Sequence, residues 1–99
     1  MRKLVHMYRG SGRAEADHPD GYTEGARHAM LVFLAGFSDQ YDWARAEQVA
    51  QAQGWRDVEF TKAGKITTEA IADQDPTLRE RYAAALADGS ALVVYAAAE

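Results

Sequence analysis

The chain has no cysteine among its 99 residues. Disulfide bonds, thiolate metal ligands and cysteine nucleophiles are therefore excluded, and nothing points to an oxidising compartment. Long apolar runs are missing as well, because no apolar stretch approaches the length of a membrane span. The first nine residues lack the apolar core of a secretory signal. We therefore expect a cytoplasmic protein that does not associate with a membrane.

Acidic residues outnumber basic ones, and the formal net charge at pH 7 is −4. Residues 1–13 hold four basic residues and no acidic one, so the remainder is more acidic than the chain as a whole. A body with this charge rarely binds nucleic acid, and we expect no nucleic-acid partner. The apolar fraction of 47% and the charged fraction of 26% are ordinary for a globular protein, so residues 1–99 should form one domain.

The first part of the chain predicts two strands joined by a long connection. Residues 4–8 contain Val and Tyr and stop at a glycine-rich segment, which is typical of a strand. Residues 10–27 hold four glycines and a proline without periodicity, which predicts a flexible loop. Residues 28–37 are apolar at odd and even positions from 29 to 34, as in a strand buried on both faces.

Two helices are marked by their ends. Each begins at a residue type that accepts hydrogen bonds from the free amides of a first turn, and each ends before a glycine that can adopt a left-handed conformation. The expected helices run from Ser38 or Asp39 to about Gln53, before Gly54, and from Asp75-Pro76 to Gly89.

The remaining segments predict further strands. Residues 57–62 alternate between apolar and polar side chains, which indicates a half-buried strand. Ala63-Gly64 can form a tight turn into a short partner strand at Lys65–Thr67. Residues 91–97 are apolar on both faces and predict the last strand.

From residue 28 onward this order is βαββαβ, which predicts an α+β, ferredoxin-like two-layer sandwich with an additional N-terminal strand. Both helices should then cover one face of an antiparallel sheet, and the first strand with its loop, or a second copy of the chain, should cover the other. If the strand at Lys65–Thr67 is absent, the alternative is ββαβαβ with a mixed sheet. The βαββαβ order resembles the dimeric α+β barrel architecture, which implies a pocket between two facing sheets and no particular site residue.

Three histidines are candidates for acid–base chemistry. His6 and His28 lie in or beside expected strands, where burial can shift a pKa, and both could reach the same sheet face. His18 is flanked by Asp17 and by Pro19-Asp20 in the expected loop. A packed structural role, or for His18 an ordinary loop position, is the more common interpretation of such histidines. None has the i, i+4 spacing of a helical metal pair, so we expect no metal and no cofactor.

The segment from Arg9 to Arg13 has the ingredients of an anion site, because its glycines free backbone amides and its two guanidinium groups can fork onto phosphate or carboxylate. It lacks the spacing and the lysine of a phosphate loop, and a solvated turn is the alternative. We take Arg9, Arg13, Tyr8 and His18 as the candidate binding residues, with a small anionic ligand as one candidate partner.

These observations favour a small binding or interaction module that forms a homodimer or recognises a protein partner, rather than an enzyme. The alternative is a cofactor-free enzyme or small-molecule sensor with a pocket between sheet and loop, in which His6 and His28 would be the catalytic residues. No residue pattern specifies a substrate or a reaction.

Overall fold

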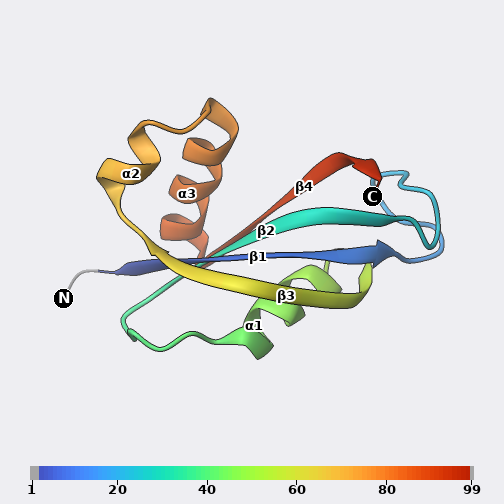
Figure 1. Cartoon of the computed structure of the whole chain (residues 1–99), viewed down its shortest axis with the longest axis horizontal. Helices are drawn as coiled ribbons and strands as arrows, with labels where there is room; N and C mark the ends of the chain where they lie inside the picture. The colour runs from blue at the N-terminus through green and yellow to red at the C-terminus, as the bar shows by residue number, and fades with distance from the viewer. Residues whose placement is uncertain (1–2, 99) are drawn as a thin grey trace.

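The computed structural model describes residues 3–98, which form four strands and three helices (Figure 1). In chain order the elements are β1 (Leu4–Ala14), β2 (Arg27–Gly36), α1 (Trp43–Gln51), β3 (Trp55–Ile66), α2 (Thr68–Ala72), α3 (Pro76–Asp88) and β4 (Ser90–Ala98). The strands form one open sheet in the order β3-β1-β2-β4, and each neighbouring pair is antiparallel. The α+β class is therefore confirmed.

The ferredoxin-like arrangement is not observed. The separate strand expected at Lys65–Thr67 does not form, because β3 continues through Ile66 and Thr67 caps α2. Gly64, expected in a tight turn, instead pairs with Met7 in the ladder between β3 and β1. The order of elements is closer to the ββαβαβ alternative, but the sheet is antiparallel rather than mixed.

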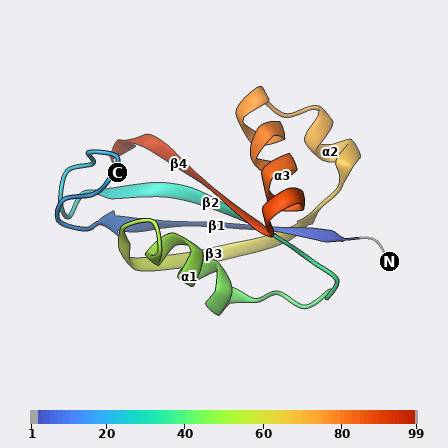
Figure 2. The same cartoon turned by 180° about the vertical axis from the view of Figure 1, so that it is seen from behind.

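The helices α1 and α3 lie on opposite faces of the sheet, as Figures 1 and 2 show, and not on one face as expected. The residues of β2 account for this arrangement. Its odd-numbered apolar residues pack with α3 and its even-numbered ones with α1: Leu31, Phe33 and Ala35 on one face, and Met30, Val32 and Leu34 on the other. Since each face has a helix of its own, the two-sided apolar pattern of β2 is satisfied within one chain.

The first strand is longer than the sequence indicated. β1 continues to Ala14, so Gly10 and Gly12 are strand residues, and the connection to β2 spans residues 15–26 rather than 10–27. The backbone of β3 comes very close to Gly10, where an added Cβ would lie 2.7 Å from the Cα of Phe60. Gly10 adjoins the first of two register shifts between β1 and β3, each of which adds a residue to β3.

The ends of the long helices follow local rules. Asp75 caps α3 by accepting a hydrogen bond from the Leu78 amide at 3.0 Å, and Gly89 ends it with φ of +95°, as expected. The expected start of α1 at Ser38 or Asp39 is wrong. The helix begins at Trp43, because Asp42 is the residue whose carboxylate accepts from the Arg45 amide, at 3.0 Å.

Candidate functional site

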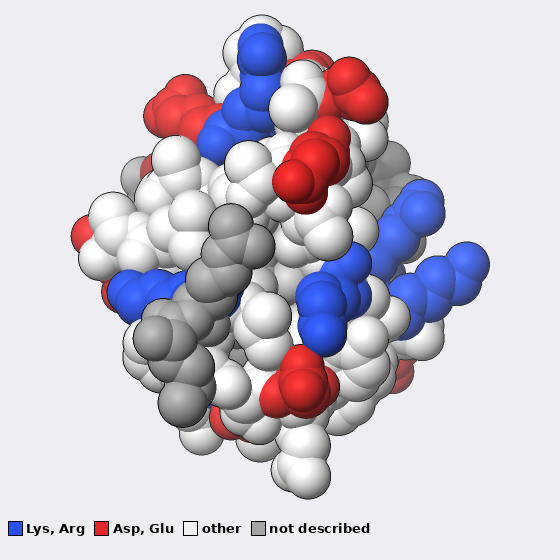
Figure 3. All heavy atoms as spheres, turned by 90° about the vertical axis from the view of Figure 1, so that its left-hand side faces the viewer, with Lys and Arg blue, Asp and Glu red and all other residues white. Residues whose placement is uncertain are grey.

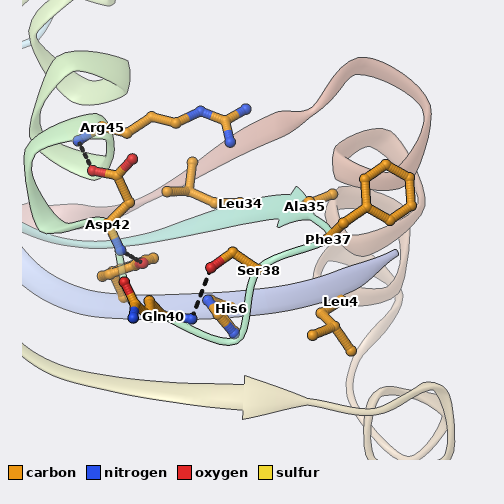
Figure 4. Close-up of a pocket in the computed structure, with 11 residues that line it drawn as sticks. Leu4, His6, Leu34, Ala35, Phe37, Ser38, Gln40, Asp42 and Arg45 are labelled. Carbon is orange, nitrogen blue, oxygen red and sulfur yellow. Dashed lines mark hydrogen bonds between the residues drawn. The ribbon is translucent and has the colours of Figure 1, made fainter. Parts of the chain in front are cut away.

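A hollow of about 210 Å³ lies between the first half of β1 and the segment 37–42 that leads into α1 (Figure 4). Even-numbered residues of β1 and β2 form its floor, since they share the face that α1 covers further along the sheet. The segment before α1 and the first turn of the helix form its wall. The principal lining residues are Leu4, His6, Tyr8, Leu34, Phe37, Gln40, Asp42 and Arg45.

Tyr8 holds the wall of this hollow in place. Its side chain is fully buried, and its hydroxyl oxygen accepts a hydrogen bond of 2.6 Å from the backbone amide of Asp42. The ring of Trp43 lies edge-on to it, with the ring centres 5.3 Å apart. Burial raises the pKa of the Tyr8 hydroxyl above its ordinary value, so the group stays neutral. Tyr8, a candidate binding residue from the sequence, therefore positions the start of α1.

His6 lies on the floor of the hollow and is 5% exposed. Its Nε2 atom is buried and has no hydrogen-bond partner among residues 3–98. The ring of Tyr41 covers it edge-on at 4.7 Å, and Lys65 is its cross-strand neighbour on β3. Lys65 in turn binds Asp39 at 2.9 Å. Burial and then the Lys65 cation lower the pKa of His6, while Asp39 opposes them, so the imidazole is neutral at pH 7.

The hollow offers few groups for chemistry. A neutral imidazole supplies one N–H donor and one acceptor. The Arg45 guanidinium extends across Leu34 in Figure 4 and donates to the carbonyl oxygen of Gly89 at 3.2 Å, beside the start of β4. These groups could bind a small polar or anionic molecule, and the carboxylate whose charge acts on His6, Asp39, is engaged by Lys65.

Acidification below pH 6.5 should destabilise the fold through His6. The unfolded chain protonates this histidine near its ordinary pKa of 6.5, whereas the folded pKa is lower, so the unfolded state binds more protons between the two values. The free energy of unfolding should therefore fall as the pH decreases from 6.5 through the folded pKa. Urea unfolding at several pH values should show a smaller decrease for His6→Gln than for the wild type. An equal decrease in both proteins would remove His6 as the cause.

The other two histidines lie at the far end of the sheet, in an aromatic cluster around Trp55. His18 packs against the Trp55 ring at 4.7 Å, and its Nδ1 accepts from the Asp20 amide at 3.1 Å. The Nδ1 atom of His28 lies 2.8 Å from the carbonyl oxygen of Tyr95, and since that oxygen only accepts, Nδ1 carries the proton. His28 thereby satisfies a carbonyl beside the register shift between β2 and β4.

The structure places His6 and His28 on the same sheet face but not in one site. His28 is the cross-strand partner of Gly12, six positions along β1 from His6. Six strand residues span about 20 Å. A catalytic pair made of these two histidines, which the sequence allowed, is therefore too far apart to act on one group.

Arg9 and Arg13 lie on the opposite face of β1 from His6 and Tyr8, because they are odd-numbered residues of the strand. Their neighbours across the sheet are also basic, namely Arg27 on β2, and Arg56 and Lys62 on β3. These neighbours were missed in the sequence because they lie far from Arg9 and Arg13 along the chain and the register that joins them contains two shifts.

Within residues 3–98, no group of three or more His, Cys, Asp or Glu side chains is placed to hold a metal ion. No helix in this part of the chain is long and apolar enough to cross a membrane. Comparison with models of known protein families, with curated proteins and with solved structures finds no match to this chain.

Proposed function

We propose that the chain is an interaction module that self-associates by pairing the free edge of β4 with β4 of a second copy. The observation that carries this proposal is a difference between the two edges of the sheet. The edge strand β3 has five charged residues and two register shifts, features that oppose pairing with another strand. The edge strand β4 has no charged residue from Ser90 to Ala98, and it pairs regularly with β2 from Ser90 to Val94.

The hydrogen-bonding groups of this edge can be assigned from one contact. The amide of Ala35 donates to the carbonyl oxygen of Gly89 at 2.9 Å, so this pair is a hydrogen-bonded one. In an antiparallel ladder such pairs alternate with pairs whose backbone groups point away. In this register Ser90, Leu92 and Val94 therefore direct their N–H and C=O groups outward, away from β2.

These outward groups suit an antiparallel pair of two β4 strands. With Leu92 on a two-fold axis, it would face Leu92 of the second copy, and Ser90 would face Val94. The pairing residues are small or apolar, so no charge selects against an identical strand. Because each copy carries a net charge of −4, salt should strengthen the dimer by screening the repulsion between the copies.

Light scattering during size-exclusion chromatography, over a concentration series, should show a dimer for the wild type. Val94→Pro should be monomeric, since proline removes an outward N–H and leaves the hydrogen bonds to β2 intact. Val94→Ala is the matched control, because it shortens the same side chain but keeps the N–H, and it should remain a dimer. A wild type that is monomeric at all concentrations, or a dimeric Val94→Pro variant, would overturn the proposal.

A further inference from the structure

The face of the sheet that carries α3 is only partly covered. The helices α2 and α3 lie over the end where β1 begins, and the other end of this face has no helix above it (Figures 1 and 2). The uncovered part includes a shallow hollow of about 220 Å³ lined by Arg9, Gly10, Ser11, Ala29, Glu59 and Thr61. We call this uncovered part, with the basic residues described next, the basic face.

Basic residues from three strands are aligned on the basic face. Arg13 is the cross-strand partner of both Arg27 on β2 and Arg56 on β3, so three arginines form a row across the sheet. Arg9, further along β1, is the partner of Lys62 on β3. Like charges placed directly opposite each other destabilise a sheet. Residues chosen for stability alone would not be arranged in this way.

The cations of the basic face form no ion pair among residues 3–98, although Glu59 lies on the same face, opposite Ser11. The single ion pair within 4.0 Å in residues 3–98 is the one between Lys65 and Asp39, on the other face of the sheet. Arg13 Nη1 donates instead to the carbonyl oxygen of Gly25 at 2.9 Å, and Arg27 Nη1 to the Ser11 hydroxyl at 2.7 Å. Neutral acceptors fix the orientation of a guanidinium group and leave its charge available to an anion.

The charge arrangement at the other end of the molecule is different. At the end of the molecule where β1 begins, which faces the viewer in Figure 3, Lys and Arg side chains are interspersed with Asp and Glu. The arginine row lies at the opposite end of β1. The basic face therefore differs from the end shown in Figure 3, although the chain as a whole has a net charge of −4.

An exposed aromatic ring borders the basic face. Tyr95 of β4 is 47% exposed, and with Arg9 it lines a second hollow, of about 270 Å³, whose floor includes Met7 and Leu31. A flat ring beside an apolar floor can stack a nucleobase, while neighbouring cations bind the phosphates that connect one base to the next. A carboxylate-rich protein would use the cations and leave the ring and the hollow unoccupied.

We propose that the basic face binds single-stranded nucleic acid, with the arginine row, Arg9 and Lys62 on the phosphates and a base stacked on Tyr95. This partner is the one that the net charge led us to exclude. That expectation rested on the net charge, which averages over the whole chain, whereas a ligand meets one surface. The cations lie on β1, β2 and β3 and not on the free edge of β4, so their contribution does not depend on dimer formation, whereas Tyr95 lies on β4.

Fluorescence anisotropy with labelled oligothymidylate and oligouridylate of about 16 nucleotides tests this proposal. The wild type should bind, and the logarithm of its affinity should fall with the logarithm of salt concentration by about 0.7 per phosphate contact. Arg13→Gln with Arg56→Gln should weaken binding at least tenfold in low salt and reduce that slope by about 1.4. Arg79→Gln with Arg81→Gln on the exposed surface of α3 changes the net charge equally and should leave binding unchanged.

Two further measurements separate a nucleic-acid site from general attraction of anions. Tyr95→Phe should bind as the wild type does, and Tyr95→Ala should lose affinity without a change in salt slope. If Arg13→Gln with Arg56→Gln unfolds, Arg9→Gln with Lys62→Gln tests the same charges, because neither side chain makes a hydrogen bond within residues 3–98. Absence of binding in low salt, equal competition by polyglutamate, or equal weakening by the α3 variant would overturn the proposal.

Discussion

Alanine at position 10 should prevent stable folding, with a loss of more than about 3 kcal/mol in the free energy of unfolding. A Cβ at Gly10 would overlap the Glu59 carbonyl group and lie 2.7 Å from the Cα of Phe60. These atoms belong to the backbone of β3, so no side-chain rotation can relieve the overlap. The strands would have to separate where β1 passes the first register shift. Chemical denaturation monitored by circular dichroism measures the loss.

Gly64→Ala is the matched control for this substitution. Gly64 lies in the same strand pair, and a Cβ there would have no heavy atom within 4 Å. Alanine limits the unfolded chain more than glycine does, so this variant should be as stable as the wild type or more stable by up to about 1 kcal/mol. Similar losses from both substitutions would show that close approach of the β3 backbone is not the reason for glycine at position 10.

Trp55→Ala should lower the free energy of unfolding by about 3–5 kcal/mol. The Trp55 side chain is 1% exposed and packs with Ala14, Met30 and Ala50 beneath α1. It also supports the connection between β1 and β2, because the ring of His18 rests on it at 4.7 Å. The variant should therefore show faster amide hydrogen exchange throughout residues 15–26, in addition to the loss of stability.

Trp43→Ala provides the comparison, since Trp43 is 40% exposed and its main aromatic contact is with Tyr8. Loss of that edge-on contact should cost about 1 kcal/mol and leave exchange in residues 15–26 unchanged. If both tryptophan variants accelerate exchange in this connection equally, the aromatic cluster around Trp55 is not what holds it.

The sequence predicted helix ends correctly where they depend on residues within one turn of the chain. The start and end of α3 depend on Asp75, Pro76 and Gly89, each acting on backbone groups within one turn, and the structure confirms them. The same logic placed α1 too early, because Ser38 and Asp39 are also capping residue types. What selects Asp42 is the Tyr8 hydroxyl, 34 positions away in sequence, which accepts from its amide.

Properties that depend on pairing between distant segments were not predictable in the same way. Gly10 and Gly12 indicated a turn, but both lie in β1. A Cβ at Gly10 would meet the backbone of β3, and a Cβ at Gly12 would meet side chains of β2 and β3. The basic face needs the register that sets Arg13 between Arg27 and Arg56, and no periodicity within one segment contains that register. The apolar residues at both odd and even positions of residues 28–37 predicted burial on both faces correctly, but this pattern could not say which element covers each face.

The strand order β3-β1-β2-β4 also determines how the chain must fold. The strands β1 and β2 are consecutive in the chain, joined by residues 15–26 without a helix, and they occupy the centre of the sheet. Both edge strands pair over long separations, since Val5 meets Ile66 and Leu34 meets Ser90. Closing such loops is slow, so folding should take milliseconds or longer, with the central hairpin as the template. Until β4 docks, the edge of β2 from Met30 to Leu34 stays open, and this apolar edge is the main site at which folding intermediates would aggregate.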